Sequence, residues 1–113
     1  NEVVVGLWGS SATNVWAVTQ NGTIYRSNGT TWARVPTLLD GAFGIGSGTL
    51  VKVWGNGPTN VWAAGYSGLL MHYDGFRWSQ IDSPTSEYLS GLWVSASGDV
   101  WGVGGTGVIV RSP

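Results

Sequence analysis

The chain has 113 residues, a length that suits one ordinary domain. Only 10% of the residues are charged, the net charge is −1, and the five Lys and Arg residues are scattered. Nucleic-acid binding needs a basic stripe and membrane insertion needs a long apolar run, so the sequence predicts neither kind of partner.

Glycine and tryptophan are unusually abundant, with 19 and 8 residues respectively, and cysteine is absent. The lack of cysteine excludes a disulfide framework and a thiolate metal site. An average soluble domain has roughly 25% charged residues, more than twice the share found here. Low charge with abundant Trp, Gly, Ser, Thr and Asn favours a secreted or cell-surface protein.

The predicted elements are all short strands, rich in β-branched and aromatic residues and bounded by Gly, Asn, Ser or Pro. The first group of strands is VVVGLWG, VWAVTQ, TIYRS and TWARV. The same series returns as LVKVWG, VWAAGY, LLMHY and RWSQI, and begins a third time as YLSGLWV, VWGVGG and VIVRS. Asn-Gly in SNGT and Asp-Gly in YDGF fit tight hairpins that need positive φ. No segment has a helical period with caps.

Tryptophan spacing defines three repeats. In each repeat two Trp residues stand eight positions apart: Trp8 and Trp16, Trp54 and Trp62, Trp93 and Trp101. A further Trp follows sixteen positions later in the first two repeats, at Trp32 and Trp78. The offset between repeats falls from 46 to 39 residues because the connector TLLDGAFGIGSG is longer than its counterpart.

Four antiparallel strands in a unit of about 40–50 residues are typical of a β-propeller blade. We therefore expect an all-β protein with a first blade at about 1–37, a linker at 38–48, a second blade at about 49–83 and an incomplete third blade at about 88–113. A blade cannot bury both faces alone, so the repeated Trp residues are predicted to be wedges between neighbouring blades.

The pattern W-G-x-x-x-x-[TS]-[ND]-V-W-A-V-G, followed by G-x-[IL]-x-x-x-[DN]-G-x-x-W, resembles the Trp-rich propeller repeats of many bacterial secreted and surface proteins. It covers almost the whole chain, with Thr19 in place of Gly in the first repeat and Ala64 in place of Val in the second. The resemblance implies a propeller architecture. It implies little chemistry, because that family is functionally mixed.

The strand count of four, four and three leaves the ring unfinished, since propellers usually need four to eight blades. Two explanations stay open. Copies of the chain complete the ring, as two-blade lectin subunits of the propeller class do when they trimerise, or the chain is a fragment of a longer propeller. The sequence favours self-assembly, with a dimer of six blades as the expected homo-oligomer.

Catalytic and metal-binding signals are weak. The single histidine, His72, stands where the other repeats have Arg26 and Arg111, which indicates a polar residue on the strand surface. Asp99 is replaced by asparagine in the other repeats, and the glycine-rich segment 41–48 lacks the G-K-[ST] of a phosphate loop. We expect no enzyme activity, no metal site and no cofactor.

Ligand binding is the class of function that remains. Aromatic rings with neutral hydrogen-bonding groups suit the apolar faces and hydroxyl groups of sugars. Positions that vary between repeats are the better candidates because blade packing does not dictate them. The predicted carbohydrate-binding residues are Gln20, Asn21, Asp40, Phe43, Tyr66, Ser67, Glu87 and Tyr88. The leading hypothesis is a non-catalytic, lectin-like propeller that acts as a multivalent homo-oligomer on glycans. The alternative is a structural or protein-interaction propeller, including an engineered or reconstructed fragment, whose main property is self-assembly.

Overall fold

The computed structural model describes residues 3–20, 22–35, 50–81, 85–107 and 109–112, and these residues form three antiparallel sheets. The first sheet contains β1 (Val4–Ser11), β2 (Asn14–Thr19), β3 (Ile24–Ser27) and β4 (Trp32–Val35). The second contains β5 (Leu50–Gly57), β6 (Asn60–Gly65), β7 (Leu70–Tyr73) and β8 (Trp78–Gln80). The third contains β9 (Leu89–Val94), β10 (Val100–Gly104) and β11 (Ile109–Ser112). Two single 3₁₀ turns, η1 (Tyr66–Gly68) and η2 (Gly105–Gly107), follow β6 and β10.

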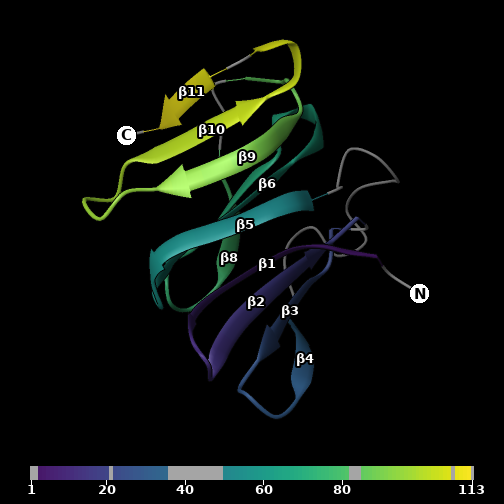
Figure 1. Cartoon of the computed structure of the whole chain (residues 1–113), viewed down its shortest axis with the longest axis vertical. Helices are drawn as coiled ribbons and strands as arrows, with labels where there is room; N and C mark the ends of the chain where they lie inside the picture. The colour runs from purple at the N-terminus through teal and green to yellow at the C-terminus, as the bar shows by residue number, and fades with distance from the viewer. Residues whose placement is uncertain (1–2, 21, 36–49, 82–84, 108, 113) are drawn as a thin grey trace.

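The three sheets pack face to face as propeller blades, which we call the first, second and third blade in chain order (Figure 1). Strand order follows chain order in each blade, and the first strands β1, β5 and β9 lie beside one another. The all-β propeller class and the four-stranded blades are therefore confirmed. The third blade has three strands among the described residues, as the sequence predicted. The predicted linker at 38–48 lies outside the described residues.

Strand register reproduces the tryptophan spacing. Each pair of Trp residues eight positions apart faces across the first two strands of its blade: Trp8 and Trp16, Trp54 and Trp62, Trp93 and Trp101. A one-residue slip would exchange the two faces of a strand, so this repeated pairing keeps the same positions on the same face of every blade.

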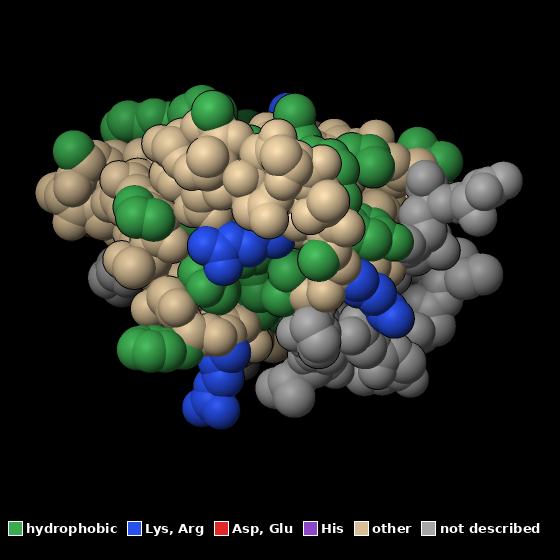
Figure 2. All heavy atoms as spheres, turned by 90° about the horizontal axis from the view of Figure 1, so that it is seen from below, with side chains coloured by type: hydrophobic (Ala, Val, Ile, Leu, Met, Phe, Trp, Pro, Cys, Tyr) green, Lys and Arg blue, Asp and Glu red, His purple; other side chains and the backbone are tan. Residues whose placement is uncertain are grey.

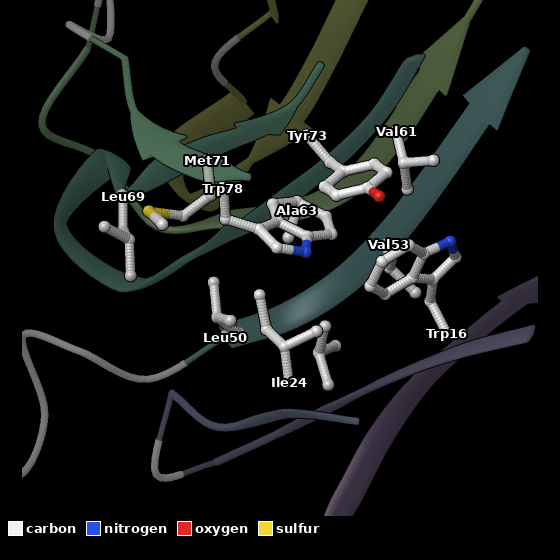
Figure 3. Close-up of a cluster of buried hydrophobic side chains, with 11 residues drawn as sticks. Trp16, Ile24, Leu50, Val53, Val61, Ala63, Leu69, Met71, Tyr73 and Trp78 are labelled. Atoms are coloured by element: carbon white, nitrogen blue, oxygen red, sulfur yellow. The ribbon is translucent and has the colours of Figure 1, made fainter. Parts of the chain in front are cut away.

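The main core lies between the first and second blades (Figure 3). Trp16 of β2 is fully buried there, with its ring centroid 4.7 Å from that of Tyr73 and 5.3 Å from that of Trp78. A second cluster joins the second and third blades, and its buried members are Trp62, Ala64, Leu70, Leu89, Val94 and Val100. Burial of aromatic and branched side chains between blades is the chief stabilising contribution of this fold.

The wedge prediction is correct for only some of the tryptophans. Trp16, Trp62 and Trp78 are buried between blades, whereas Trp54 is 40% exposed although its blade has a neighbour on both sides. The Trp8 ring lies against Gly55, where an added Cβ would come within 2.9 Å of it. The third blade has Val94 in place of that glycine. Val94 is buried in the cluster that joins the second and third blades, so the third blade offers Trp54 no glycine of this kind.

The two outer hairpins use glycine for the backbone and a polar side chain for the hydrogen bonds. Gly29 and Gly75 have φ of 102° and 103°. Asp74 does not adopt positive φ; its Oδ1 instead accepts hydrogen bonds from the backbone N–H groups of Phe76 (2.9 Å) and Arg77 (3.1 Å). The sequence signal for a turn was correct, but positive φ at both central residues is not present.

Candidate functional site

Two exposed tyrosines meet where the second and third blades adjoin. Tyr66 belongs to η1 and Tyr88 directly precedes β9, and their ring centroids lie 4.8 Å apart at 70°, an edge-to-face contact. Tyr66 is 45% exposed and Tyr88 41% exposed, so both rings keep a large surface open to a ligand. We call these two residues the tyrosine pair.

Close backbone packing fixes the Tyr66 side of the pair. Within η1, the N–H of Leu69 donates to the carbonyl oxygen of Tyr66 at 3.0 Å. Gly68 has φ of 71°, and an added Cβ there would lie 1.9 Å from the carbonyl oxygen of Thr85, which leaves room only for glycine. The loop therefore rests directly on the segment that leads to the third blade. Ser67, which lies between Tyr66 and Gly68, adopts φ of 58°, an unfavourable region for a residue other than glycine.

The Tyr88 side is fixed in the same manner by the third blade. The N–H of Gly105 donates to the carbonyl oxygen of Tyr88 at 2.9 Å. An added Cβ at Gly104 would lie 1.7 Å from that same oxygen. Glycine contacts thus hold both backbones in place, and the two rings contact each other where the two blades adjoin.

The structure brings four of the eight predicted site residues together at this place. Tyr66 and Tyr88 are in contact, and Ser67 and Glu87 are their chain neighbours. Gln20 is exposed in the corresponding loop of the first blade, where its N–H donates to the carbonyl oxygen of Val3 at 3.1 Å. The remaining predictions, Asn21, Asp40 and Phe43, lie outside the described residues. A role of these residues in ligand binding stays a prediction.

Sequence reasoning missed the glycines that position the pair. Gly104 ends strand β10, and Gly68 and Gly105 stand in the turns η1 and η2. Glycine is common at such positions, and no local sequence signal marks a glycine whose backbone lies against another segment. The repeated spacing of Gly68 with Gly22 and Gly107 was the available signal, since all three adopt positive φ.

A second polar cluster recurs on the opposite ends of the strands. In each blade an Asn or Asp at the start of the second strand meets a basic or imidazole side chain of the third strand. The distances are 2.8 Å from Arg26 Nε to Asn14 Oδ1, 2.6 Å from His72 Nε2 to Asn60 Oδ1, and 3.0 Å from Arg111 Nη2 to Asp99 Oδ1. The same side chains also lie on a tryptophan ring: Arg26 on Trp16, His72 on Trp62 and Arg111 on Trp101.

His72 thus has a structural place in this repeated cluster. Asn60 Oδ1 also accepts a hydrogen bond from Trp62 Nε1–H at 3.1 Å, so it is an acceptor and His72 carries a proton on Nε2. Burial lowers the pKa of His72 below its ordinary value of 6.5, and the charge of Asp74 opposes this in part. The imidazole is half-buried against the Trp62 ring, more enclosed than the predicted strand-surface residue.

Among the described residues no group of three or more His, Asp or Glu side chains is placed to hold a metal ion. The same residues include no helix of the length and apolar character needed to cross a membrane.

Comparisons with known proteins support the fold alone. No family profile and no curated protein sequence matches the chain. Among solved structures, the chain resembles YCF48 bound to a D1 peptide, with a TM-score of 0.79 and 20% sequence identity. The match covers 97% of this chain and 37% of that one, so this chain spans little more than a third of its structural neighbour. The likeness to Trp-rich bacterial repeats stays an interpretation of the residue spacing.

Proposed function

We propose that this chain is a non-catalytic β-propeller binding module whose tyrosine pair contacts an extended segment of another polypeptide. The observation that carries the proposal is the exposed, edge-to-face pair of Tyr66 and Tyr88, held by loops of two different blades. A pair that is positioned before the ligand arrives loses little conformational entropy on binding.

The geometry of the pair favours a peptide over a sugar. The two rings stand at 70° to each other, so they form an angled surface and not one flat platform. Extended and proline-containing segments dock in grooves lined by aromatic rings, where an apolar side chain fits between the walls. The peptide in the YCF48 structure supports this class of ligand for the fold.

The engagement of the polar side chains supports a binding role without catalysis. His72 is hydrogen-bonded to Asn60 and stacked on Trp62. Asp74 accepts backbone hydrogen bonds in its turn, and Asp99 is paired with Arg111. Each of these groups has a structural use that explains its place in the repeat.

A random-peptide display selection against the chain, followed by calorimetry with the enriched peptides, tests the proposal. We expect Tyr66→Ala and Tyr88→Ala each to weaken binding by about thirtyfold or more, the size of a hot-spot loss. Phe76→Ala is the matched control, because Phe76 is an aromatic residue 93% exposed in a hairpin away from the pair. A selection that enriches no peptide, or equal losses in the Phe76 variant, would contradict the proposal.

A neutral glycan is the second candidate ligand. The low charge of the chain and the two tyrosine hydroxyls at the pair favour it, since a sugar offers apolar faces together with hydroxyl groups. A glycan array with the wild-type chain and the Tyr88→Ala variant separates the two candidates. Binding to a neutral or amino sugar that the variant loses supports the lectin-like alternative, and a blank array removes it.

A further inference from the structure

An apolar groove opens on the side of the first blade that faces away from the second. Its volume is about 350 Å³, and all four strands of the blade contribute to it. The residues that line it, which we call the first end face, are Val4, Leu7, Ala17, Tyr25 and Trp32. Figure 2 looks at the molecule from this end and shows hydrophobic side chains gathered in a hollow beside Lys or Arg side chains.

The same positions are buried one blade further on. The second blade carries Leu50, Val53, Ala63, Met71 and Trp78 there, each 46 residues after its counterpart. All five belong to the core cluster that joins the second blade to the first. Trp32 is 52% exposed and Trp78 only 2%, and this difference follows from the presence of a neighbouring blade. The first end face is therefore an unoccupied copy of a surface that accepts a blade.

The opposite side of the third blade carries the complementary surface. Trp93, Trp101, Val103 and Ile109 are exposed on it, and we call this surface the third end face. Its residues repeat, at an offset of 85, those with which the first blade faces the second. Six positions are identical: Gly6 and Gly91, Trp8 and Trp93, Trp16 and Trp101, Val18 and Val103, Ile24 and Ile109, Arg26 and Arg111.

Strand register places these identical residues in identical arrangements. Gly6 pairs with Val18 as Gly91 pairs with Val103. The pairing of Val18 with Ile24 returns as that of Val103 with Ile109. The third blade therefore presents the same sheet face that already packs on the second blade within the chain.

The glycine that receives the tryptophan ring is also present on the first end. Between the first two blades, the Trp8 ring lies against Gly55. The counterpart of Gly55 in the first blade is Gly9, which is exposed, and the counterpart of Trp8 in the third blade is Trp93. The third end face of one copy thus carries the tryptophan ring, and the first blade of another copy carries the glycine that would receive it.

We propose that a second copy of this chain docks head to tail, its third end face on the first end face, and repeats the contact between the first and second blades. This surface is separate from the tyrosine pair, so the proposal stands apart from the proposed function. Two different surfaces that complement each other generate a head-to-tail assembly, which closes when the rotations add to a ring. Two three-bladed chains supply six blades, within the usual range, so the expected assembly is a homodimer.

Light scattering and sedimentation of the 113-residue chain test the contact. We expect twice the mass of a single chain, and at least a tenfold weaker self-association in Leu7→Glu and in Ile109→Glu, each of which buries a charge in the contact. Leu7 is 62% exposed and Ile109 69% exposed, so neither change disturbs the core of a single chain. Phe76→Glu is the control: its side chain belongs to neither end face, and its association should equal the wild type.

Mixing the two variants tests the head-to-tail arrangement. In a mixture, the third end face of Leu7→Glu and the first end face of Ile109→Glu are both intact, so one good contact forms and association returns. If like faces bound each other, Ile109→Glu would stay associated alone through its unchanged first end faces, and that result would overturn the proposal. A wild-type chain that stays monomeric would also overturn the proposal. That result would indicate that the two end faces pack against other propeller blades.

Discussion

At the scale of single residues, the exposed fraction of a tryptophan depends on which residues of the neighbouring blade lie opposite it. Trp62 and Trp54 face each other across β5 and β6, yet Trp62 is 8% exposed and Trp54 is 40% exposed. Trp62 packs in the cluster that joins the second and third blades, whereas for Trp54 the third blade has Val94 where the second blade has the glycine that the Trp8 ring contacts. Two identical residues in one blade therefore make unequal contributions to stability.

Replacement of Trp62 by alanine should lower the free energy of unfolding by about 3–5 kcal/mol, as large core truncations do. Urea unfolding followed by circular dichroism measures this loss. Trp54→Ala is the matched control and should cost clearly less, since much of its ring already faces solvent. Equal losses in the two variants would mean that exposure does not report the packing role of these rings.

The histidine makes stability depend on pH. Burial lowers the pKa of His72 in the folded chain below 6.5, so the unfolded chain binds the proton more readily. Protonation then favours unfolding, and the contribution of His72 is fully present above pH 6.5 and is lost as the pH falls below it. Denaturant unfolding on either side of pH 6.5 should show lower stability at the acidic pH.

His72→Arg is the control for this dependence, because Arg26 and Arg111 occupy the same place in the other blades. Arginine keeps its charge at every accessible pH and can lie on the Trp62 ring as Arg26 lies on Trp16. The fall in stability just below pH 6.5 should be smaller in this variant. A fall as steep as that of the wild type would assign it to other groups.

At the scale of elements, the strands were predictable and so were the residues of the loops that build the site, but the course of those loops was not. β-branched runs between turn residues are local signals, and they placed the strands of all three blades. η1 is a three-residue turn whose course depends on Thr85, seventeen positions after Gly68. No local pattern encodes that approach, so the contact between Tyr66 and Tyr88 emerged only in three dimensions.

Gly68→Ala tests how tightly η1 is held. Gly68 and Gly98 both have positive φ, at 71° and 97°, so alanine costs about 1–2 kcal/mol of backbone strain at either position. Only at Gly68 does the added Cβ meet a backbone atom, the carbonyl oxygen of Thr85 at 1.9 Å. Gly68→Ala should therefore cost roughly 1–3 kcal/mol more than Gly98→Ala, as overpacked sites do, in thermal or urea unfolding. Equal costs would show that η1 shifts freely, and the tyrosine pair would then lack the rigidity argued above.

At the scale of the whole molecule, the three blades of this chain followed from the strand count, but the match between the two end faces did not. The repeat aligned Trp8 with Trp93 in the sequence. Which face of each sheet these residues occupy depends on register, including the irregularity between Val4 and Gly6 in β1. With the faces assigned, the exposed residues at the two ends proved to be counterparts of residues buried within the chain.

Head-to-tail association predicts a melting temperature that rises with protein concentration, because mass action favours a native state that binds its own copies. Differential scanning calorimetry of the wild type over a hundredfold range of concentration measures the rise. The Leu7→Glu variant should melt at a temperature that does not change with concentration. A constant melting temperature in the wild type would argue against a dimer under those conditions.

The third blade, with three strands among the described residues, bears on how the proposed head-to-tail assembly would come apart. Val35 ends β4, the fourth strand of the first blade, and Ile81 directly follows β8, the fourth strand of the second blade. Both side chains pack against the clusters between blades. The third blade has no such strand among its described residues, so the contact it offers to another copy lacks one apolar side chain. In the proposed head-to-tail assembly we therefore expect the contacts between chains to be weaker than those within a chain, where the covalent backbone also keeps neighbouring blades together. On heating or dilution we expect the proposed assembly to separate first into three-bladed chains, and the blades of each chain to come apart only afterwards.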